Sequence, residues 1–97
     1  MKISGFDWDA GNWPKCGKHG VSREEIEYML KSARIAPDAT HSQQEPRYIA
    51  VGRNPQGRPM FVAFALRQWG DRLSIRPISA RYMHAREANR YEESSSI

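Results

Sequence analysis

Apolar and polar residues alternate with two different periods along this chain, and each period predicts a different kind of element. Within residues 3–8, Phe6 and Trp8 alternate with Asp7, which predicts a short, half-buried strand. Further along, apolar residues recur at spacings of three and four, which predicts an amphipathic helix that covers one face of a sheet. The residues of that stripe are Ile26, Met29, Leu30 and Ala33.

A start signal precedes this helix. Ser22 and Glu25 form an S-x-x-E capping box, in which each side chain accepts a hydrogen bond from the backbone N–H of the other residue. Between the first strand and the box, Asn12 has the side chain to cap another, short helix. The sequence therefore predicts a strand, a short helix and a capped helix in that order.

Turn residues divide the second half of the chain into strands. Residues 34–46 are rich in proline and polar side chains and predict mostly loop, with only residues 35–36 as strand material. Residues 47–53 and 59–66 predict a hairpin, because the intervening N-P-Q-G suits a type I turn. After a W-G-D turn, residues 73–80 predict a third strand of this meander.

Pro77 interrupts the last strand. Because proline has no backbone N–H to donate to the ladder, it predicts a bulge or an edge position. The bulge matters for Arg76 and Arg81, whose spacing of five puts them on opposite faces of a regular strand. A bulge between them would bring both to one surface. Residues 84–93 contain helix formers and predict a final helix.

This order of elements predicts an α+β fold, with a small antiparallel β-sheet and helices packed on one side. We expect a single domain over residues 1–93 and a frayed tail over residues 94–97. One cysteine excludes an internal disulfide framework and suits a reducing cytoplasm. No apolar stretch has the length of a signal peptide core or a membrane span, so we expect a cytoplasmic protein without a membrane partner.

The formal net charge of +4 is concentrated in one stretch. Residues 67–90 contain six arginines against Asp71 and Glu87, and six minus two equals the surplus of the whole chain. A cationic patch attracts polyanions by counterion release, so nucleic acid is the leading class of partner. The alternative is a solvated face that only keeps the protein in solution, and charge alone favours that alternative.

Several residues are candidates for chemistry. Cys16 and His19 have the spacing of half a zinc site, but a structural site needs four ligands and the chain has no second cysteine. We therefore expect Cys16 to be a small core residue and no metal or other cofactor to bind. His19 and His41 can exchange protons near neutral pH. Glu45 and Arg47 suit a local surface ion pair.

Arg76 and Arg81 carry permanent charge on a rigid strand. Each can clamp a phosphate bidentately and stabilise the charge that develops in phosphoryl transfer, although pairing with a glutamate across the sheet is an equal alternative. Tyr82 and Tyr91 suit stacking on an unstacked base, or closing the core under the last helix.

Four motifs together resemble one protein family over residues 6–93. They are F-x-W-D from residue 6, K-H-G-V-S from residue 18, H-S-x-x-E-x-R from residue 41 and I-x-x-I-S-A-R from residue 75, followed by R-E and Y-E-E. The combination is similar to the BrnT family of type II toxins, in the RelE-like superfamily of ribonuclease toxins. Pro77 departs from the family, in which an aliphatic residue is usual, and Gly11, Pro14 and Gly17 shorten the first helix.

The resemblance implies a RelE-like fold and an endoribonuclease that cuts mRNA and stops translation. It also implies a BrnA-like antitoxin as partner, in a homodimer or a toxin–antitoxin hetero-oligomer. The RNA 2′-hydroxyl would attack its neighbouring phosphate without a metal. The catalytic candidates are Arg76, Arg81, His19, His41 and Glu45. The RNA-binding candidates are Lys18, Arg47, Tyr82, Arg86 and Tyr91.

Two other classes of function remain open from the sequence. One is a non-catalytic module that binds RNA or only an antitoxin. The other is a structural metal-binding protein that uses Cys16 and His19.

Overall fold

The computed structural model describes residues 3–41 and 45–94, without the side chains of His41 and of residues 91–94. Its strands are β1 (Ile3–Phe6), β2 (Arg34–Pro37), β3 (Arg47–Arg53), β4 (Pro59–Trp69) and β5 (Arg72–Tyr82). Its helices are α1 (Arg23–Leu30) and α2 (Ala85–Ser94), with the 3-10 turns η1 (Lys15–Gly17) and η2 (Ala39–His41). The strands and α-helices lie where the sequence predicts them, and β2 extends the two residues of expected strand material.

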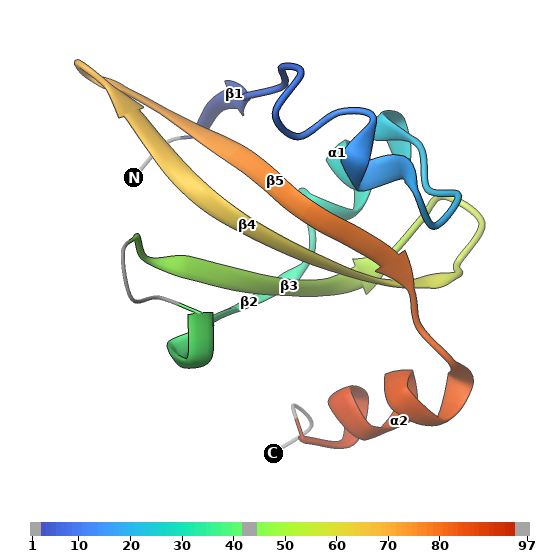
Figure 1. The fold of residues 1–97 in the computed structure, drawn as a ribbon. Coiled ribbons are helices and arrows are strands. Elements are labelled where there is room, and N and C mark those ends of the chain that lie inside the picture. Colours follow the sequence, from blue (N-terminus) through green and yellow to red (C-terminus); the bar gives the residue numbers. More distant parts are fainter. Residues whose placement is uncertain (1–2, 42–44, 95–97) are drawn as a thin grey trace.

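The sheet has the strand order β1-β5-β4-β3-β2 (Figure 1). Strands β2 to β5 pair antiparallel, whereas β1 lies parallel to β5 at one edge. The predicted α+β class is confirmed, but the sheet is mixed rather than purely antiparallel. The difference arises because the chain crosses from β1 through α1 to the opposite edge, so that the later meander ends beside β1.

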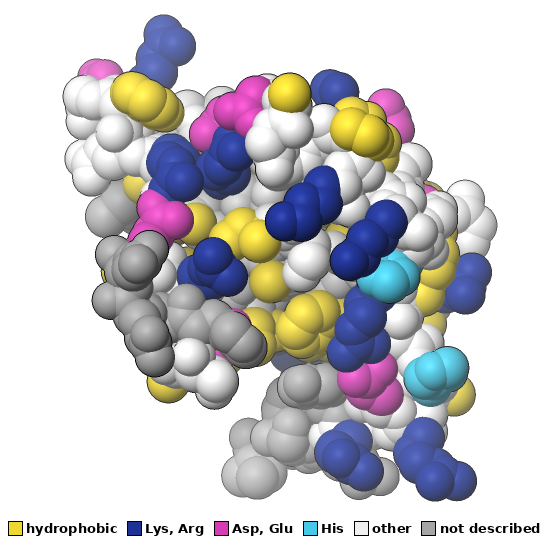
Figure 2. All heavy atoms as spheres, viewed as in Figure 1, with side chains coloured by type: hydrophobic (Ala, Val, Ile, Leu, Met, Phe, Trp, Pro, Cys, Tyr) yellow, Lys and Arg dark blue, Asp and Glu magenta, His cyan; other side chains and the backbone are white. Residues whose placement is uncertain are grey.

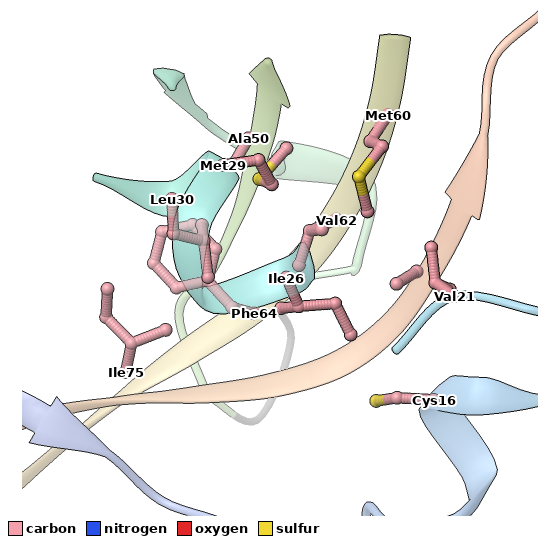
Figure 3. Packing of buried hydrophobic residues seen from close by; sticks show 11 residues of the cluster. Cys16, Val21, Ile26, Met29, Leu30, Ala50, Met60, Val62, Phe64 and Ile75 are labelled. Carbon is pink, nitrogen blue, oxygen red and sulfur yellow. The ribbon is translucent and has the colours of Figure 1, made fainter. Parts of the chain in front are cut away.

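Helix α1 covers one face of the sheet with its predicted apolar stripe. Ile26 and Met29 are fully buried and Leu30 is 6% exposed (Figure 3). They pack against the inward side chains of the three central strands, among them Ala50, Val62, Phe64 and Ile75. A Cβ at Gly52 would lie 3.2 Å from the backbone oxygen of Met29, so glycine allows α1 to approach β3 closely.

Glu25 joins three elements at one end of the sheet. The capping box forms as predicted, since the N–H of Ser22 donates to the Glu25 carboxylate at 3.0 Å and the N–H of Glu25 donates to the Ser22 hydroxyl at 3.1 Å. The same carboxylate accepts hydrogen bonds from the Asn54 amide in the β3–β4 turn and from the Tyr82 hydroxyl, both at 2.8 Å. The first turn of α1 is therefore fixed to the ends of β3 and β5.

Strand β5 contains the predicted bulge, next to Pro77. Ser79 pairs with Ala63, and Pro77 pairs with the next residue of β4, Phe64. Ile78 is therefore the extra residue of β5. The ladder continues without interruption on both sides of it.

The bulge decides which face the two arginines of β5 occupy. Arg76 pairs with Ala65 and Arg81 pairs with Phe61. These two β4 residues are four apart and so share a face, which is the face turned away from α1. The predicted effect of a bulge is thus confirmed, because both arginines lie on one surface.

The buried side chain of Asn12 fastens the bulge to the loop after β1. Its Nδ2 donates to the carbonyl oxygens of Asp7 and Pro77, both at 2.9 Å, and its Oδ1 accepts from the N–H of Asp9 at 2.9 Å. The expectation that Asn12 caps a helix is wrong, because these three bonds use its amide. The turn η1 begins after Pro14 without a side-chain cap.

Helix α2 leaves the end of β5 and, among the described residues, makes few contacts with the sheet (Figure 1). Ala88 is buried, and Glu87 pairs with Arg81 on the face opposite α1. The helices therefore do not share one side of the sheet as expected, because the bulge turns Arg81 away from α1 and Glu87 follows it. Ser94 ends α2, and residues 95–97 of the expected tail lie outside the described residues.

Replacing Asn12 by alanine should lower the free energy of unfolding by about 1–3 kcal/mol, because the buried carbonyl of Pro77 loses its donor. Urea denaturation of the two proteins measures the change. Gln56→Ala is the control, since it removes an exposed amide and should change stability by less than about 0.5 kcal/mol. Equal effects of the two substitutions would contradict the role of Asn12.

The contribution of Glu25 to stability should disappear in acid. Burial by itself raises the pKa of Glu25, but hydrogen bonds from Asn54, Ser22 and Tyr82 outweigh burial and leave the pKa below its usual 4.5. A carboxyl group with a lowered pKa stabilises the fold above its unfolded-state pKa, and this contribution is lost as the pH falls through the folded-state value.

Wild type should therefore exceed Glu25→Gln in stability at neutral pH by more than it does well below pH 4.5. Urea denaturation of both proteins across this range measures the difference. A stability difference between wild type and Glu25→Gln that does not change with pH would show that the charge of Glu25 does not contribute to stability.

Candidate functional site

The face of the sheet turned away from α1 carries arginines on all three central strands. Alternation along β3, β4 and β5 puts six there: Arg72 lies at the turn that joins β4 to β5, and the other five are Arg47, Arg53, Arg67, Arg76 and Arg81. Between them lie the apolar residues Ile49, Val51, Phe61, Ala63 and Ala65. We call these eleven residues the arginine face.

Figure 2 shows hydrophobic side chains in the middle of this side of the molecule, with lysine and arginine side chains around them. Ile49, Val51 and Phe61 are only half-buried although they lie in the centre of the sheet. A flat apolar centre with cations around it suits single-stranded nucleic acid, since bases stack on apolar groups and phosphates pair with arginine.

Two aspartates from the loop after β1 hold Arg76. Its Nη2 lies 3.0 Å from Asp9 Oδ1, and its Nη1 lies 3.1 Å from Asp9 Oδ2 and 3.3 Å from Asp7 Oδ2. The hydrogen bond from Arg76, assisted by the N–H of Gly11, lowers the pKa of Asp9, and Asp9 in turn raises the pKa of Arg76. Two negative charges thus surround one positive charge at this edge of the arginine face.

One glutamate holds Arg81. The Nη1 and Nη2 atoms donate to the two carboxylate oxygens of Glu87 at 2.9 and 2.8 Å, and this bond lowers the pKa of Glu87. The guanidinium carbon lies 4.7 Å from the centre of the Phe61 ring. Glu87 therefore binds Arg81 in the bidentate geometry that a phosphate also adopts.

Arg76 and Arg81 are aligned on one face but far apart along it. Their partners on β4, Ala65 and Phe61, are four residues apart, which corresponds to about 13 Å between Cα atoms. That separation matches contacts with two phosphates of one strand better than a joint clamp on one phosphate.

Glu45 forms an ion pair with Arg67, at the end of the arginine face where β3 begins. The sequence indicated a local pair of Glu45 with Arg47, and that pair stays a prediction. Arg67 is able to reach Glu45 because Arg47 pairs with Ala65, so that residues 45 and 67 lie opposite each other just beyond that pair. The carboxylate of Glu45 thus lies among the cations of this face.

Lys18 and His19 follow the turn η1, which contacts β5, and both side chains are exposed. Cys16 is 1% exposed, and burial raises the pKa of its thiol, as expected for a small core residue. Among the described residues, no group of three or more His, Cys, Asp or Glu side chains is arranged to hold a metal ion.

The remaining candidates are spread over the molecule. Arg86 is exposed on α2. Tyr82 turns toward α1, where its hydroxyl donates to Glu25, and this bond raises the pKa of Tyr82. Tyr82 thus closes the core at α1 rather than under the last helix. The side chains of His41 and Tyr91 lie outside the described part of the chain.

The sequence did not reveal the carboxylates that hold the arginines. Asp9 belongs to the F-x-W-D motif, and the alternation of apolar and polar residues indicated only that this motif forms a strand. Its partner Arg76 is 67 residues away in the sequence, so no local pattern connects the two. Glu87 is six residues from Arg81, which is outside the usual helical pair spacing. The excess of arginine in this stretch was the only signal that partners were needed.

No helix in the described part of the chain is both long and apolar enough to cross a membrane. A comparison with curated proteins finds no match. A family model described as a ribonuclease toxin, BrnT, of type II toxin–antitoxin systems matches residues 8–87, which include both arginines and Glu87. The chain therefore belongs to the BrnT family of ribonuclease toxins.

Proposed function

We propose that this chain is the toxin of a type II toxin–antitoxin pair and acts in the cytoplasm as a metal-independent endoribonuclease that cleaves mRNA and arrests translation. Membership of a ribonuclease-toxin family supports ribonuclease activity in general. The structural observation that supports the proposal is the β-bulge that aligns Arg76 and Arg81 on the arginine face.

RNA carries its own nucleophile, so a protein can catalyse its cleavage by positioning, charge stabilisation and proton transfer. The 2′-oxygen attacks the adjacent phosphorus in line, and the bond from phosphorus to the 5′-oxygen of the next nucleotide breaks. One proton leaves the 2′-oxygen and one joins the departing 5′-oxygen. The products are a 2′,3′-cyclic phosphate and a 5′-hydroxyl.

Arg81 is the stronger candidate for the reacting phosphate. Its side chain is 40% exposed, whereas that of Arg76 is 17% exposed and is held between Asp7 and Asp9. A phosphate that replaces Glu87 keeps the bidentate geometry and receives the charge stabilisation of Arg81. Arg76 then orients a neighbouring phosphate of the same strand.

The other candidates supply binding and proton transfer. Lys18, Arg47 and Arg86 bind flanking backbone, while Tyr91 positions a base; Tyr82, which turns toward α1, has no part in this. His19, His41 or Glu45 moves the protons, because histidine and carboxylate groups accept and donate protons near neutral pH when their surroundings adjust them. A BrnA-like antitoxin is the second partner, in a toxin–antitoxin hetero-oligomer or bound to a homodimer of the toxin.

A second candidate function is a module that binds RNA or the antitoxin without cutting RNA. The pairing of Arg76 with two aspartates and of Arg81 with Glu87 favours the form that binds only the antitoxin, because these bonds must open before any RNA phosphate can bind. The two functions differ in cleavage, which only the first predicts.

Arg81→Ala should lower the rate of RNA cleavage by about 100-fold or more, because one donor to the developing charge has that effect in comparable sites. Cleavage of a single-stranded RNA by the purified proteins measures the rate. Lys31→Ala is the control, since it removes an exposed cation at the end of α1, which covers the other face of the sheet, and should leave cleavage unchanged. An unchanged rate in Arg81→Ala would contradict the assigned role.

Expression of the wild-type chain from a tightly controlled promoter should arrest growth, and coexpression of the neighbouring antitoxin gene should relieve the arrest. Arg81→Ala should not arrest growth because it cannot stabilise the reacting phosphate. Absence of arrest by wild type, with RNA binding retained, would favour the non-catalytic module.

An all-DNA oligonucleotide should not be cleaved, because it lacks the attacking 2′-hydroxyl. A chelator should leave cleavage of RNA unchanged. Gel analysis of matched RNA and DNA oligonucleotides measures both effects, and cleavage of DNA at a comparable rate would exclude the proposed reaction.

A further inference from the structure

We propose that Arg58 is a contact for the phosphate backbone of single-stranded RNA, at the end of the sheet where β4 begins and β5 ends. This inference rests on the proposed function, since it adds a binding site to the same RNA substrate. Sequence patterns did not single out Arg58, which precedes β4 in a turn.

Arg58 is held in a fixed orientation by an aromatic ring. Its guanidinium carbon lies 3.6 Å from the centre of the Tyr82 ring, which is a stacking contact. The ring is itself fixed, because the Tyr82 hydroxyl donates to the two carboxylate oxygens of Glu25 at 2.9 and 2.8 Å. The Asn54 amide donates to Glu25 at 2.8 Å and holds that carboxylate in place.

The backbone of Arg58 is fixed as well. Its N–H donates to the side-chain oxygen of Asn54 at 2.8 Å, and its carbonyl oxygen accepts from the N–H of Asn54 at 3.0 Å. Little conformational freedom is therefore left to lose when Arg58 binds a ligand, which favours binding.

Within the part of the chain that the structure describes, no carboxylate compensates the charge of Arg58. Arg67, Arg76 and Arg81 each form an ion pair with a carboxylate. Among the described residues, no carboxylate forms an ion pair with Arg58, and its side chain is exposed. A phosphate can bind Arg58 without displacing an internal partner, whereas it must displace one at each of the other three.

A guanidinium group that stacks on an aromatic ring keeps its N–H groups free at its edge, and the 3.6 Å between the Arg58 guanidinium carbon and the ring centre fits such a stack. Bidentate binding of phosphate uses N–H groups at that edge. The arrangement thus combines a fixed plane, an exposed cation and unused donors, which is the chemistry that recognises a phosphodiester.

The position of Arg58 connects it to the arginine face. Tyr82 directly follows Arg81, so their Cα atoms are about 3.8 Å apart although their side chains point to opposite faces. Arg58 and Arg81 therefore lie at the same end of the sheet. The backbone of an RNA strand bound at Arg81 can reach Arg58 by passing around this end of the sheet. Because Arg58 thus continues the arginine face, we favour RNA over an acidic protein as its ligand.

The test uses an oligonucleotide with 2′-O-methyl groups throughout, which has no free 2′-hydroxyl and cannot be cleaved by the proposed reaction. Fluorescence anisotropy at several salt concentrations gives the affinity and its salt dependence. Arg58→Ala should weaken binding about tenfold. It should also reduce the slope of log affinity against log salt by about 0.7, the value for one lost phosphate contact on a single strand.

Two further variants make the result specific. Arg58→Lys keeps the charge but not the planar stack, so the slope should be retained while affinity falls partway. Lys31→Ala removes one exposed cation at the end of α1, which covers the other face of the sheet, and should change neither quantity. Thermal unfolding of each variant confirms that it is folded before binding is measured.

Arg58→Ala that matches Lys31→Ala in affinity and slope would overturn the inference and leave the proposed function intact, provided that wild type binds the oligonucleotide. Arg58→Ala that binds RNA normally but loses affinity for a polyglutamate peptide would also overturn it, because Arg58 would then serve a protein partner. Wild type that neither binds nor cleaves RNA would overturn both proposals.

Discussion

The β-bulge at Ile78 is the constraint on which the arginine face depends. Without the extra residue, Arg76 and Arg81 would lie on opposite faces of β5. Pro77 has no N–H to donate, and its carbonyl oxygen is bound by the buried amide of Asn12. The bulge and the loop after β1 are therefore one unit, and that loop also carries the aspartates that hold Arg76.

The protein pairs Arg67, Arg76 and Arg81 on its proposed RNA surface with its own carboxylates. Clustered arginines repel one another, and ion pairs such as that of Arg81 with Glu87 reduce this repulsion while the surface is empty. When RNA binds, a phosphate replaces the carboxylate at such an arginine. The arginine is therefore paired with an anion both before and after RNA binds. Arg58 differs because stacking on Tyr82, rather than a carboxylate, fixes its orientation.

Sequence patterns that span only a few residues were sufficient to predict the helices, strands and turns of the fold. The capping box at Ser22 and Glu25 depends on residues three apart, and the β3–β4 turn depends on four consecutive residues. Pro77 indicated the bulge because its missing N–H restricts where it can pair. Each of these signals lies within a few residues of the feature that it predicts.

Contacts between distant segments were not predictable in the same way. Nothing near β1 indicates that it lies parallel to β5, because that pairing depends on where the chain returns after α1. For the candidate site, charge identified Arg76 and Arg81 but not the aspartates and the glutamate that hold them. The roles of His19 and Glu45 in proton transfer remain predictions, because they depend on the position of a bound substrate.

The central claim is that RNA binds the face of the sheet opposite α1. Amide chemical shifts of isotope-labelled protein, titrated with a single-stranded oligonucleotide that carries 2′-O-methyl groups, test this claim most directly. RNA that binds there should cause the largest shift changes at Phe61, Ala63 and Ser79 on that face. Largest changes at Met29 and Leu30 of α1, with Phe61 and Ala63 unaffected, would contradict it.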